Sequence, residues 1–302
     1  MQLNNASSWA KPWEVVFLTN FSDACFRAIP AVAQIADDLP VRLTLLHAYD
    51  SKRQSAAEAE ATLHSFFPEA DRYRDTSRRV MPGSPLDVLR RVHDNQAVDL
   101  IVCPASDMLG LPRPVHRSLR GRILRGLGLP LWTIGRGADP ARLGKKVRNV
   151  GCWLNFDDGN MPHVAFAVEY ATRLNARLHL FYVPPEIHDG MILPLAPDRA
   201  LHPSGVRDFF QQRFGHMDIR PEIHMTPRHG GKVQASLTQA NEIDVLFTGV
   251  PRWPMLAGFR RIDSCPCPAI CIDRNPAIRS WNRQRDPMFQ PADVETRVAQ
   301  AS

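Results

Sequence analysis

Two asparagines stand at the ends of two similar apolar runs and are candidates for ligand-binding chemistry. Asn20 follows residues 15–19, and Asn155 follows residues 150–154 in the same Asn-Phe-(Ser/Asp)-Asp context. Open α/β sheets bind ligands in the crevice at the carboxyl ends of parallel strands, and an asparagine amide can both donate and accept hydrogen bonds there. The alternative is an asparagine that stabilises a strand-end turn through its own side chain. Both interpretations are open.

Basic residues suggest anion binding at two further places. The predicted helix at residues 115–127 and the loop before it carry several cations that could capture an anion, although a solvated basic face is the alternative. These cations are Arg113, His116, Arg117, Arg120, Arg122 and Arg125. Residues 228–232, Arg-His-Gly-Gly-Lys, precede a predicted helix at 233–240. They form either an anion site at a helix N-terminus or a plain glycine turn.

Metal and catalytic patterns are not recognised in the sequence. Cys265, Cys267 and Cys271 are close together, but a zinc knuckle usually needs a second cysteine pair or histidines at matching spacing. No complete P-loop, G-x-S-x-G or H-E-x-x-H motif occurs. We therefore predict no metal site, no catalytic residues and no enzyme activity, with weak ATP hydrolysis as the only enzymatic alternative.

The composition is that of an ordinary globular chain with room for two domains. Its 302 residues are 44% hydrophobic and 23% charged. No apolar run approaches the roughly 18 residues that cross a bilayer, and the first residues lack the apolar segment of a signal peptide. The net charge of +6 is spread over segments of mixed sign. We expect a cytoplasmic protein with no membrane partner and no specific nucleic-acid partner.

Strands and helices are expected to alternate along the first half. Apolar runs predict strands at residues 15–19, 41–48, 78–81, 98–103 and 129–134. Helices are predicted at 24–39, 86–94 and 115–127, with a charged helical excursion before the third strand and Ser22 or Asp23 capping the first helix. Such an order predicts a parallel sheet with right-handed crossovers. Residues 135–146 are predicted to be a linker.

The second half repeats the first. Asn20 and Asn155 differ by 135 in residue number, and the same difference aligns Arg42 with Arg177. Asp99 and Asp244 differ by 145, so the second copy contains ten extra residues. These fall within the proline-rich segment 184–207, which is expected to form a lid. A constant difference followed by a local shift indicates an internal duplication.

This repeated pattern resembles the universal stress protein family in its tandem two-domain form. The resemblance is carried by residues 18–22, 41–48 and 80–86, and by residues 99–102 followed by 129–132. It implies two Rossmann-like domains of the adenine nucleotide alpha hydrolase-like kind, at residues 13–136 and 147–273, followed by a polar C-terminal tail at 274–302. Each domain is expected to be a mainly parallel five-stranded α/β sheet with helices on both faces. The two would form an intramolecular pseudo-dimer.

The resemblance also implies a nucleotide site that this chain keeps only in part. ATP-binding members carry an acidic residue where Asn20 and Asn155 stand, and a G-x2-G-x9-G-(S/T) loop after the fourth strand. The first copy of that loop retains only its final serine, and the second retains its first glycine but is seven residues shorter. The residues that the resemblance assigns to ligand or nucleotide binding are Thr19, Asn20, Ala48, Pro104, Asp107, Arg117, Ser118, Asn155, Val183 and Gly249.

The implied function is a stress-response binding or regulatory protein that lacks the family's standard ATP site and needs no cofactor. Two alternatives stay open. One is a weakly hydrolysing member that binds ATP or another adenine nucleotide in its first domain. The other is a protein that binds a different small ligand under the 184–207 insertion. A homodimer or a regulatory protein partner is also compatible with the sequence.

Overall fold

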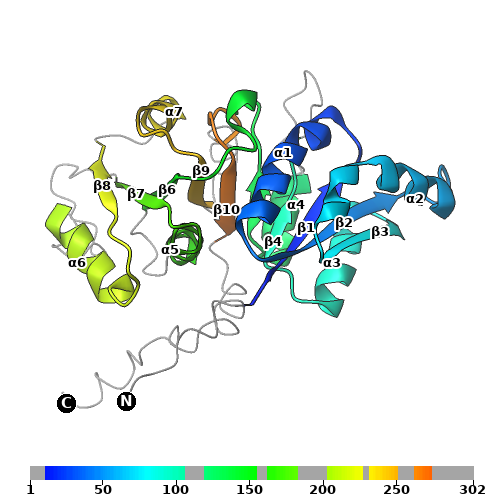
Figure 1. Ribbon diagram of the computed structural model, residues 1–302, viewed down its shortest axis with the longest axis horizontal. Coiled ribbons are helices and arrows are strands. Elements are labelled where there is room, and N and C mark those ends of the chain that lie inside the picture. The colour runs from blue at the N-terminus through cyan, green and yellow to red at the C-terminus, as the bar shows by residue number, and fades with distance from the viewer. Residues whose placement is uncertain are drawn as a thin grey trace, which may run out of the picture.

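The computed structural model describes residues 11–105, 119–154, 162–182, 203–226, 231–250 and 262–273. Within them one sheet runs through the whole molecule (Figure 1). Its strands in chain order are β1 (Trp13–Thr19), β2 (Val41–Tyr49), β3 (Thr76–Pro82), β4 (Leu100–Val102), β5 (Leu131–Thr133), β6 (Asn149–Leu154), β7 (Arg177–Tyr182), β8 (Glu222–Met225), β9 (Val245–Val250) and β10 (Ala269–Asp273).

The strand order is the same in both halves of the sheet. The full order is β3-β2-β1-β4-β5-β10-β9-β6-β7-β8. The pairs within each half are parallel, whereas β5 and β10 pair antiparallel and join the halves. The prediction of two mainly parallel five-stranded α/β sheets is therefore confirmed. The antiparallel junction runs the two halves in opposite directions, as expected for copies related by a two-fold axis.

Hydrogen bonds at the amino ends of the strands repeat as well. The Asp99 carboxylate accepts from the Glu14 backbone N–H at 2.8 Å, and the Asp244 carboxylate accepts from the Asn149 N–H at 3.0 Å. Glu14 and Asn149 differ by 135 in residue number, and Asp99 and Asp244 by 145. Equivalent positions in the two copies therefore have equivalent roles in holding the first and fourth strands together.

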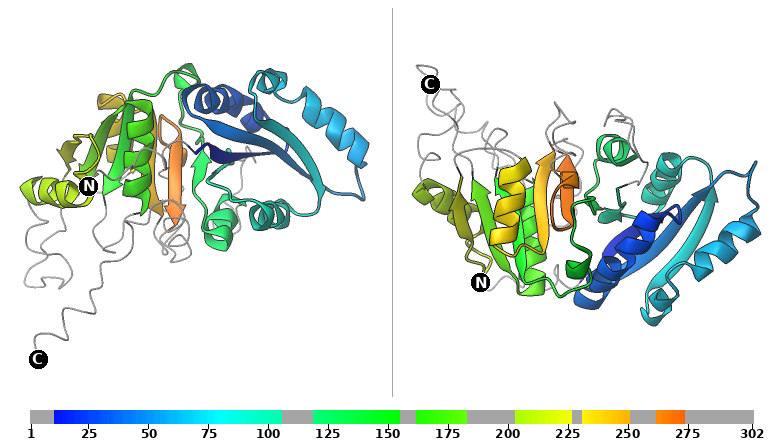
Figure 2. Two further views of the ribbon diagram at one scale, coloured as in Figure 1. Left: turned by 60° about the horizontal axis from the view of Figure 1, so that its bottom comes forward. Right: turned by 90° about the horizontal axis from the view of Figure 1, so that it is seen from above.

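Helices cover both faces of the sheet (Figure 2). They are α1 (Asp23–Asp38), α2 (Ala56–Ser65), α3 (Pro85–Asn95), α4 (Leu119–Leu127), α5 (Pro162–Leu174), α6 (Pro203–Phe214) and α7 (Gly231–Ala240), with 3-10 helices η2 (Pro68–Arg72) and η4 (Pro140–Arg142). Because strand side chains alternate between faces, Val15 and Phe17 join the core under α1, α2, α5 and α6. Val16 and Leu18 join the core under α3 and α4.

Two local predictions were only partly right. Ser22 is the N-cap residue of α1, as predicted, but its side chain accepts no hydrogen bond from a helical N–H. Its hydroxyl donates to the Cys25 sulfur, 3.6 Å away. The helical excursion before the third strand is interrupted after Ser65. Phe66 and Phe67 are both buried there, and Phe67 takes a left-handed φ of 60°. The chain then forms η2, and β3 begins at Thr76, before the expected residue 78.

The segment connecting the two halves is packed against the second half. The Gly137 N–H donates to the Asp263 carbonyl at 2.8 Å, and the Asp139 N–H donates to the Pro266 carbonyl at 3.0 Å. A Cβ on Gly135 would lie 2.5 Å from the Ile262 carbonyl oxygen, so this approach requires glycine. The predicted linker thus joins the halves through direct contacts. Among the described helices, none is long and apolar enough to cross a membrane.

Candidate functional site

Four of the predicted site residues come together at the carboxyl edge of the first half. Thr19 and Asn20 end β1, Ala48 is near the end of β2, and Pro104 follows β4. Since β1 lies between β2 and β4 in the sheet, these residues border one stretch of its edge. The chain leaves β1 towards β2 and returns to β4 on the opposite side. Such a reversal is where open α/β sheets bind ligands.

Asn20 uses its side chain within the strand-end turn. The amide oxygen accepts from the Ser22 N–H at 3.2 Å and from the Cys25 thiol at 3.3 Å. This is the local turn bond that asparagine forms readily with the backbone two residues on. Of the two roles left open by the sequence, the turn role is therefore present, and the ligand-binding role stays a prediction.

Thr19 is also engaged locally. Its hydroxyl accepts from the Phe21 N–H at 3.0 Å, where Phe21 has a left-handed φ of 59°. Its carbonyl oxygen is 3.0 Å from His47 Nδ1, and this nitrogen must carry the proton because a carbonyl can only accept. The Phe21 ring packs on the His47 ring with centroids 4.3 Å apart. Thr19 and His47 thus hold the end of β1 in place.

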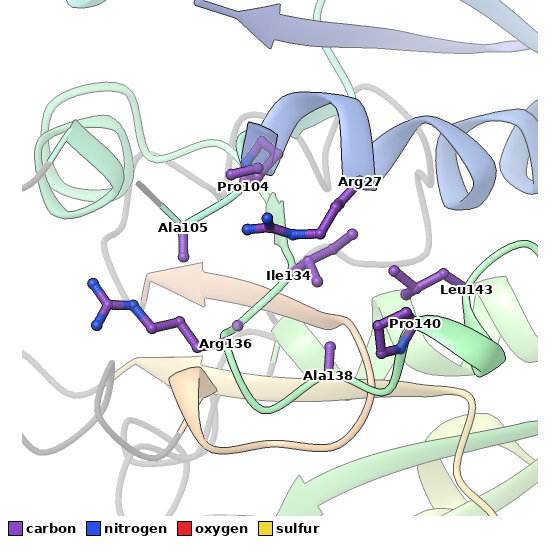
Figure 3. A pocket seen from close by; sticks show the side chains of 10 residues that line it. Arg27, Pro104, Ala105, Ile134, Arg136, Ala138, Pro140 and Leu143 are labelled. Carbon is purple, nitrogen blue, oxygen red and sulfur yellow. The ribbon is translucent and has the colours of Figure 1, made fainter. Parts of the chain in front are cut away.

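A pocket of about 220 Å³ lies beside Pro104, between α1, the ends of β4 and β5, and the connecting segment. In Figure 3 the guanidinium group of Arg27 reaches from α1 into the space between Pro104 and Ile134, and Arg136 lies at the edge beside Ala105. Both arginines are exposed. The lining is Ala24, Arg27, Pro104, Ala105, Ile134, Gly135, Arg136, Ala138, Pro140 and Leu143. The pocket therefore combines an apolar floor with two cations.

Among the described residues, the predicted site and this pocket share Pro104 alone. Thr19, Asn20 and Ala48 do not line it, and Ala48 packs against the core under α3 and α4. Gly249 lies in the other half within β9, opposite Ile272 of β10. Asp107, Arg117, Ser118, Asn155 and Val183 lie outside the described residues. Sequence reasoning missed Arg27 and Arg136, because only the fold brings the start of α1 next to the end of β5.

Arg120, one of the cations of the basic helix, forms an ion pair with a residue of the other half of the molecule. Its guanidinium donates two hydrogen bonds to the Asp263 carboxylate, at 2.7 and 3.0 Å, and a third to Thr133 at 3.2 Å. Burial works to lower the pKa of Arg120, but the hydrogen bonds and charge of Asp263 outweigh it and raise that pKa. Arg120 therefore ties the two halves together, whereas the sequence left open anion capture or a solvated basic face for this group of cations.

The cysteines are free and buried, as their apolar contexts predict. Cys265 and Cys267 lie with their sulfur atoms 3.6 Å apart. Burial raises the pKa of the Cys103 and Cys271 thiols to about 12. These two thiols are therefore protonated at neutral pH and unsuited to nucleophilic chemistry.

Several known structures with this architecture are universal stress proteins. The chain aligns with a universal stress protein from Archaeoglobus fulgidus at 12% identity and a TM-score of 0.59, over 87% of this chain and 96% of that one. A putative universal stress protein from Pseudomonas aeruginosa aligns at 14% identity and a TM-score of 0.56, over 92% and 99%. No family model and no curated protein matches the sequence. The resemblance to tandem universal stress proteins is thus confirmed at the level of the fold.

The same fold also serves a different kind of protein. The cytoplasmic domain of a prokaryotic cation chloride cotransporter aligns at 9% identity and a TM-score of 0.55, over 89% of this chain and the whole of that one. A shared fold does not carry a shared function. Function must therefore be argued from the residues of the site.

Proposed function

We propose that this chain is a cytoplasmic stress-response binding protein of the universal stress protein type, which acts by binding a small anionic ligand and carries out no catalysis. The observation that supports this most directly is the pocket at the reversal of strand order, with Arg27 and Arg136 at its rim. Guanidinium groups favour carboxylate and phosphate groups, with which they form charge-assisted hydrogen bonds. The apolar floor of the pocket would contact the uncharged part of the ligand.

Three features argue against ATP as the ligand. The pocket volume of about 220 Å³ is below the usual range of about 300–1,000 Å³ for small-molecule sites. The Asn20 amide oxygen is occupied by its own turn. Pro104 stands where the family's phosphate loop has a glycine and has no backbone N–H to offer a phosphate. We therefore favour a ligand smaller than ATP that carries a phosphate or carboxylate group.

Binding measurements on the full chain test this proposal. Calorimetric titration with inorganic phosphate, AMP and ATP should show binding that weakens by about tenfold or more in Arg27→Gln and Arg136→Gln, because a hydrogen bond to a charged group contributes about 1.5–3 kcal/mol. Arg90→Gln is the matched control, since Arg90 is an exposed arginine on α3. Failure to bind any of the three, or equal affinity in all three variants, would show the proposal to be wrong.

Adenine-nucleotide binding in the first half is the second candidate. It is supported by the position of the pocket, because dinucleotide and mononucleotide sites of open α/β sheets lie at such a reversal. ATP that co-purifies with the protein, or stabilisation by ATP that is lost in Ser118→Ala, would favour this candidate over the smaller ligand.

A further inference from the structure

Two histidines and a glutamate of the second half meet on β7 and β8, where β8 is the outer strand of the sheet. His179 Nδ1 lies 3.0 Å from His224 Nε2 and 3.5 Å from a carboxylate oxygen of Glu222. One ligand atom from each of the three side chains lies within 4.8 Å of the other two. This His-His-Glu cluster lies on β7 and the outer strand β8, whereas the pocket described above is in the first half and is lined by residues of α1, residues after β4 and β5, and the connecting segment.

Strand pairing explains why the three side chains converge. His179 of β7 is the register partner of Glu222 of β8. His224 is two residues further along β8 and so projects from the same face as Glu222. The Phe181 ring packs on the His224 ring with centroids 5.1 Å apart. The cluster is therefore positioned by two hydrogen-bonded strands and an aromatic neighbour.

A hydrogen bond behind His179 sets which of its nitrogens has a free lone pair. The Asn149 amide nitrogen donates to the Glu242 carbonyl at 3.3 Å, which turns the amide oxygen towards His179 Nε2, 3.3 Å away. The oxygen accepts, so His179 Nε2 carries the proton and Nδ1 presents a lone pair to the cluster. Metal-binding histidines are commonly oriented in this way by a partner on the other ring nitrogen.

The geometry points to a binding site for one divalent transition-metal ion of the Zn²⁺ type, ligated by His179 Nδ1, His224 Nε2 and the Glu222 carboxylate, with a fourth position open to water. Tetrahedral Zn²⁺ with bonds of about 2.0–2.2 Å separates neighbouring ligand atoms by about 3.3–3.6 Å, close to the two distances around His179 Nδ1. The two imidazoles and one carboxylate match the ligand chemistry of Zn²⁺ sites with an exchangeable position.

The different exposure of the three ligand side chains would allow a metal ion to enter the cluster. The His179 side chain is 4% exposed and that of Glu222 is 51% exposed, so one ligand is fixed in the core while another can admit an ion from solvent. Burial is the main cause that lowers the pKa of both His179 and His224. Neutral imidazole is the form that binds metal.

The first copy of the fold shows that the sheet does not need such a cluster. Thr44 pairs with Ser77 in the register that joins His179 to Glu222, and residues 44 and 179 differ by the same 135 as the rest of that segment. The Thr44 and Ser77 hydroxyls form one hydrogen bond of 3.0 Å. The ligand set is therefore particular to the second half. Without metal, His224 Nε2–H donates to His179 Nδ1 instead.

Zn²⁺ titration of the metal-free full chain tests the site. We expect one Zn²⁺ bound per chain, at least about tenfold weaker in Glu222→Gln and in His224→Gln, since even outer-shell changes weaken metal sites by about 10–100-fold. Glu222 is exposed, so Glu222→Gln should leave the fold intact, and far-UV circular dichroism checks this. His64→Gln, at an exposed histidine on α2, is the control and should bind as the unaltered chain does.

Co²⁺ in place of Zn²⁺ distinguishes this cluster from the cysteines. Binding by nitrogen and oxygen ligands should give visible ligand-field absorption without a thiolate-to-cobalt charge-transfer band. A charge-transfer band that disappears in Cys267→Ser would assign the metal to the cysteine pair and overturn the proposal. So would Zn²⁺ affinity that is unchanged in both Glu222→Gln and His224→Gln.

Discussion

At the scale of single residues, Asn20 shows how the same side chain can satisfy a binding motif or a turn. The sequence alone leaves both roles open, because an asparagine at a strand end suits either. The short contacts from its amide oxygen to Ser22 and Cys25 show the turn role. Such a choice depends on a rotamer and on the local backbone, neither of which is visible in residue types.

Replacing Asn20 should therefore affect stability and leave ligand binding unchanged. Asn20→Ala removes the acceptor for the Ser22 N–H, and we expect the free energy of unfolding to fall by about 0.5–1.5 kcal/mol, the usual net contribution of one hydrogen bond. Asn20→Asp keeps an acceptor oxygen and should retain most of that stability. Urea unfolding measures both variants. A large loss of anion affinity in Asn20→Ala would contradict the structural role.

Residues of the two candidate sites illustrate what the sequence could not reveal. Arg27 and Arg136 are more than a hundred positions apart, and Arg136 fell in a segment predicted to be only a linker. His179 and His224 match no metal motif, because they are joined by strand pairing and not by a short spacing. In each case the tertiary structure creates the proximity.

At the scale of elements, the sequence predicted most of the strands and helices because their signals are local. Apolar runs and helical spacing indicated the strands and helices of the first half. The constant difference of 135 in residue number extended these predictions to the start of the second half. The resemblance to a known family then supplied the sheet architecture. The break after Ser65 was missed, because two buried phenylalanines redirect a segment whose residues otherwise favour helix.

The connecting segment was predicted from its glycines and charges, but its close packing was not. Gly135→Ala should destabilise the protein by about 1–3 kcal/mol, because the new Cβ would meet the Ile262 carbonyl oxygen at 2.5 Å and the Asp263 Cα at 2.6 Å. Thermal unfolding measures the change.

Gly126→Ala is the matched control for this prediction. Gly126 lies within α4, and its new Cβ would meet only the Leu86 side chain, at 3.9 Å. Because alanine favours helix over glycine by up to about 1 kcal/mol, this variant should unfold at the same temperature or a higher one. Equal destabilisation by both substitutions would show that close packing of the connecting segment is not the cause.

At the scale of the whole molecule, the two halves share one structure. The β5–β10 pairing continues the sheet across the junction, and the Arg120–Asp263 ion pair spans it. One apolar cluster contains residues of β1 and α1 together with residues of α5 and β9. A tandem chain thus builds within itself an interface that two separate copies would otherwise have to form.

Trp13 is the side chain that tests this coupling most directly. It belongs to β1 but is fully buried against α5 of the other half, where its ring stacks on Phe166 at 4.8 Å between centroids. Its indole N–H donates to the Glu169 carboxylate at 3.1 Å. Trp13→Ala should reduce the free energy of unfolding by about 3–5 kcal/mol. Trp13→Phe keeps an aromatic ring in the core while losing the hydrogen bond to Glu169 and part of the ring volume, and it should cost less.

Because Trp13 contributes to a core that both halves share, its loss should destabilise them together. Denaturant unfolding followed by far-UV circular dichroism and by tryptophan fluorescence should then give one coincident transition, shifted to lower denaturant in Trp13→Ala. Two separate transitions, of which only one moves, would mean that each half folds independently and that the junction contributes little. A single shifted transition would instead show that the pseudo-dimer is the folding unit. A ligand in the first-half pocket or a metal at the His-His-Glu cluster would then stabilise the whole chain.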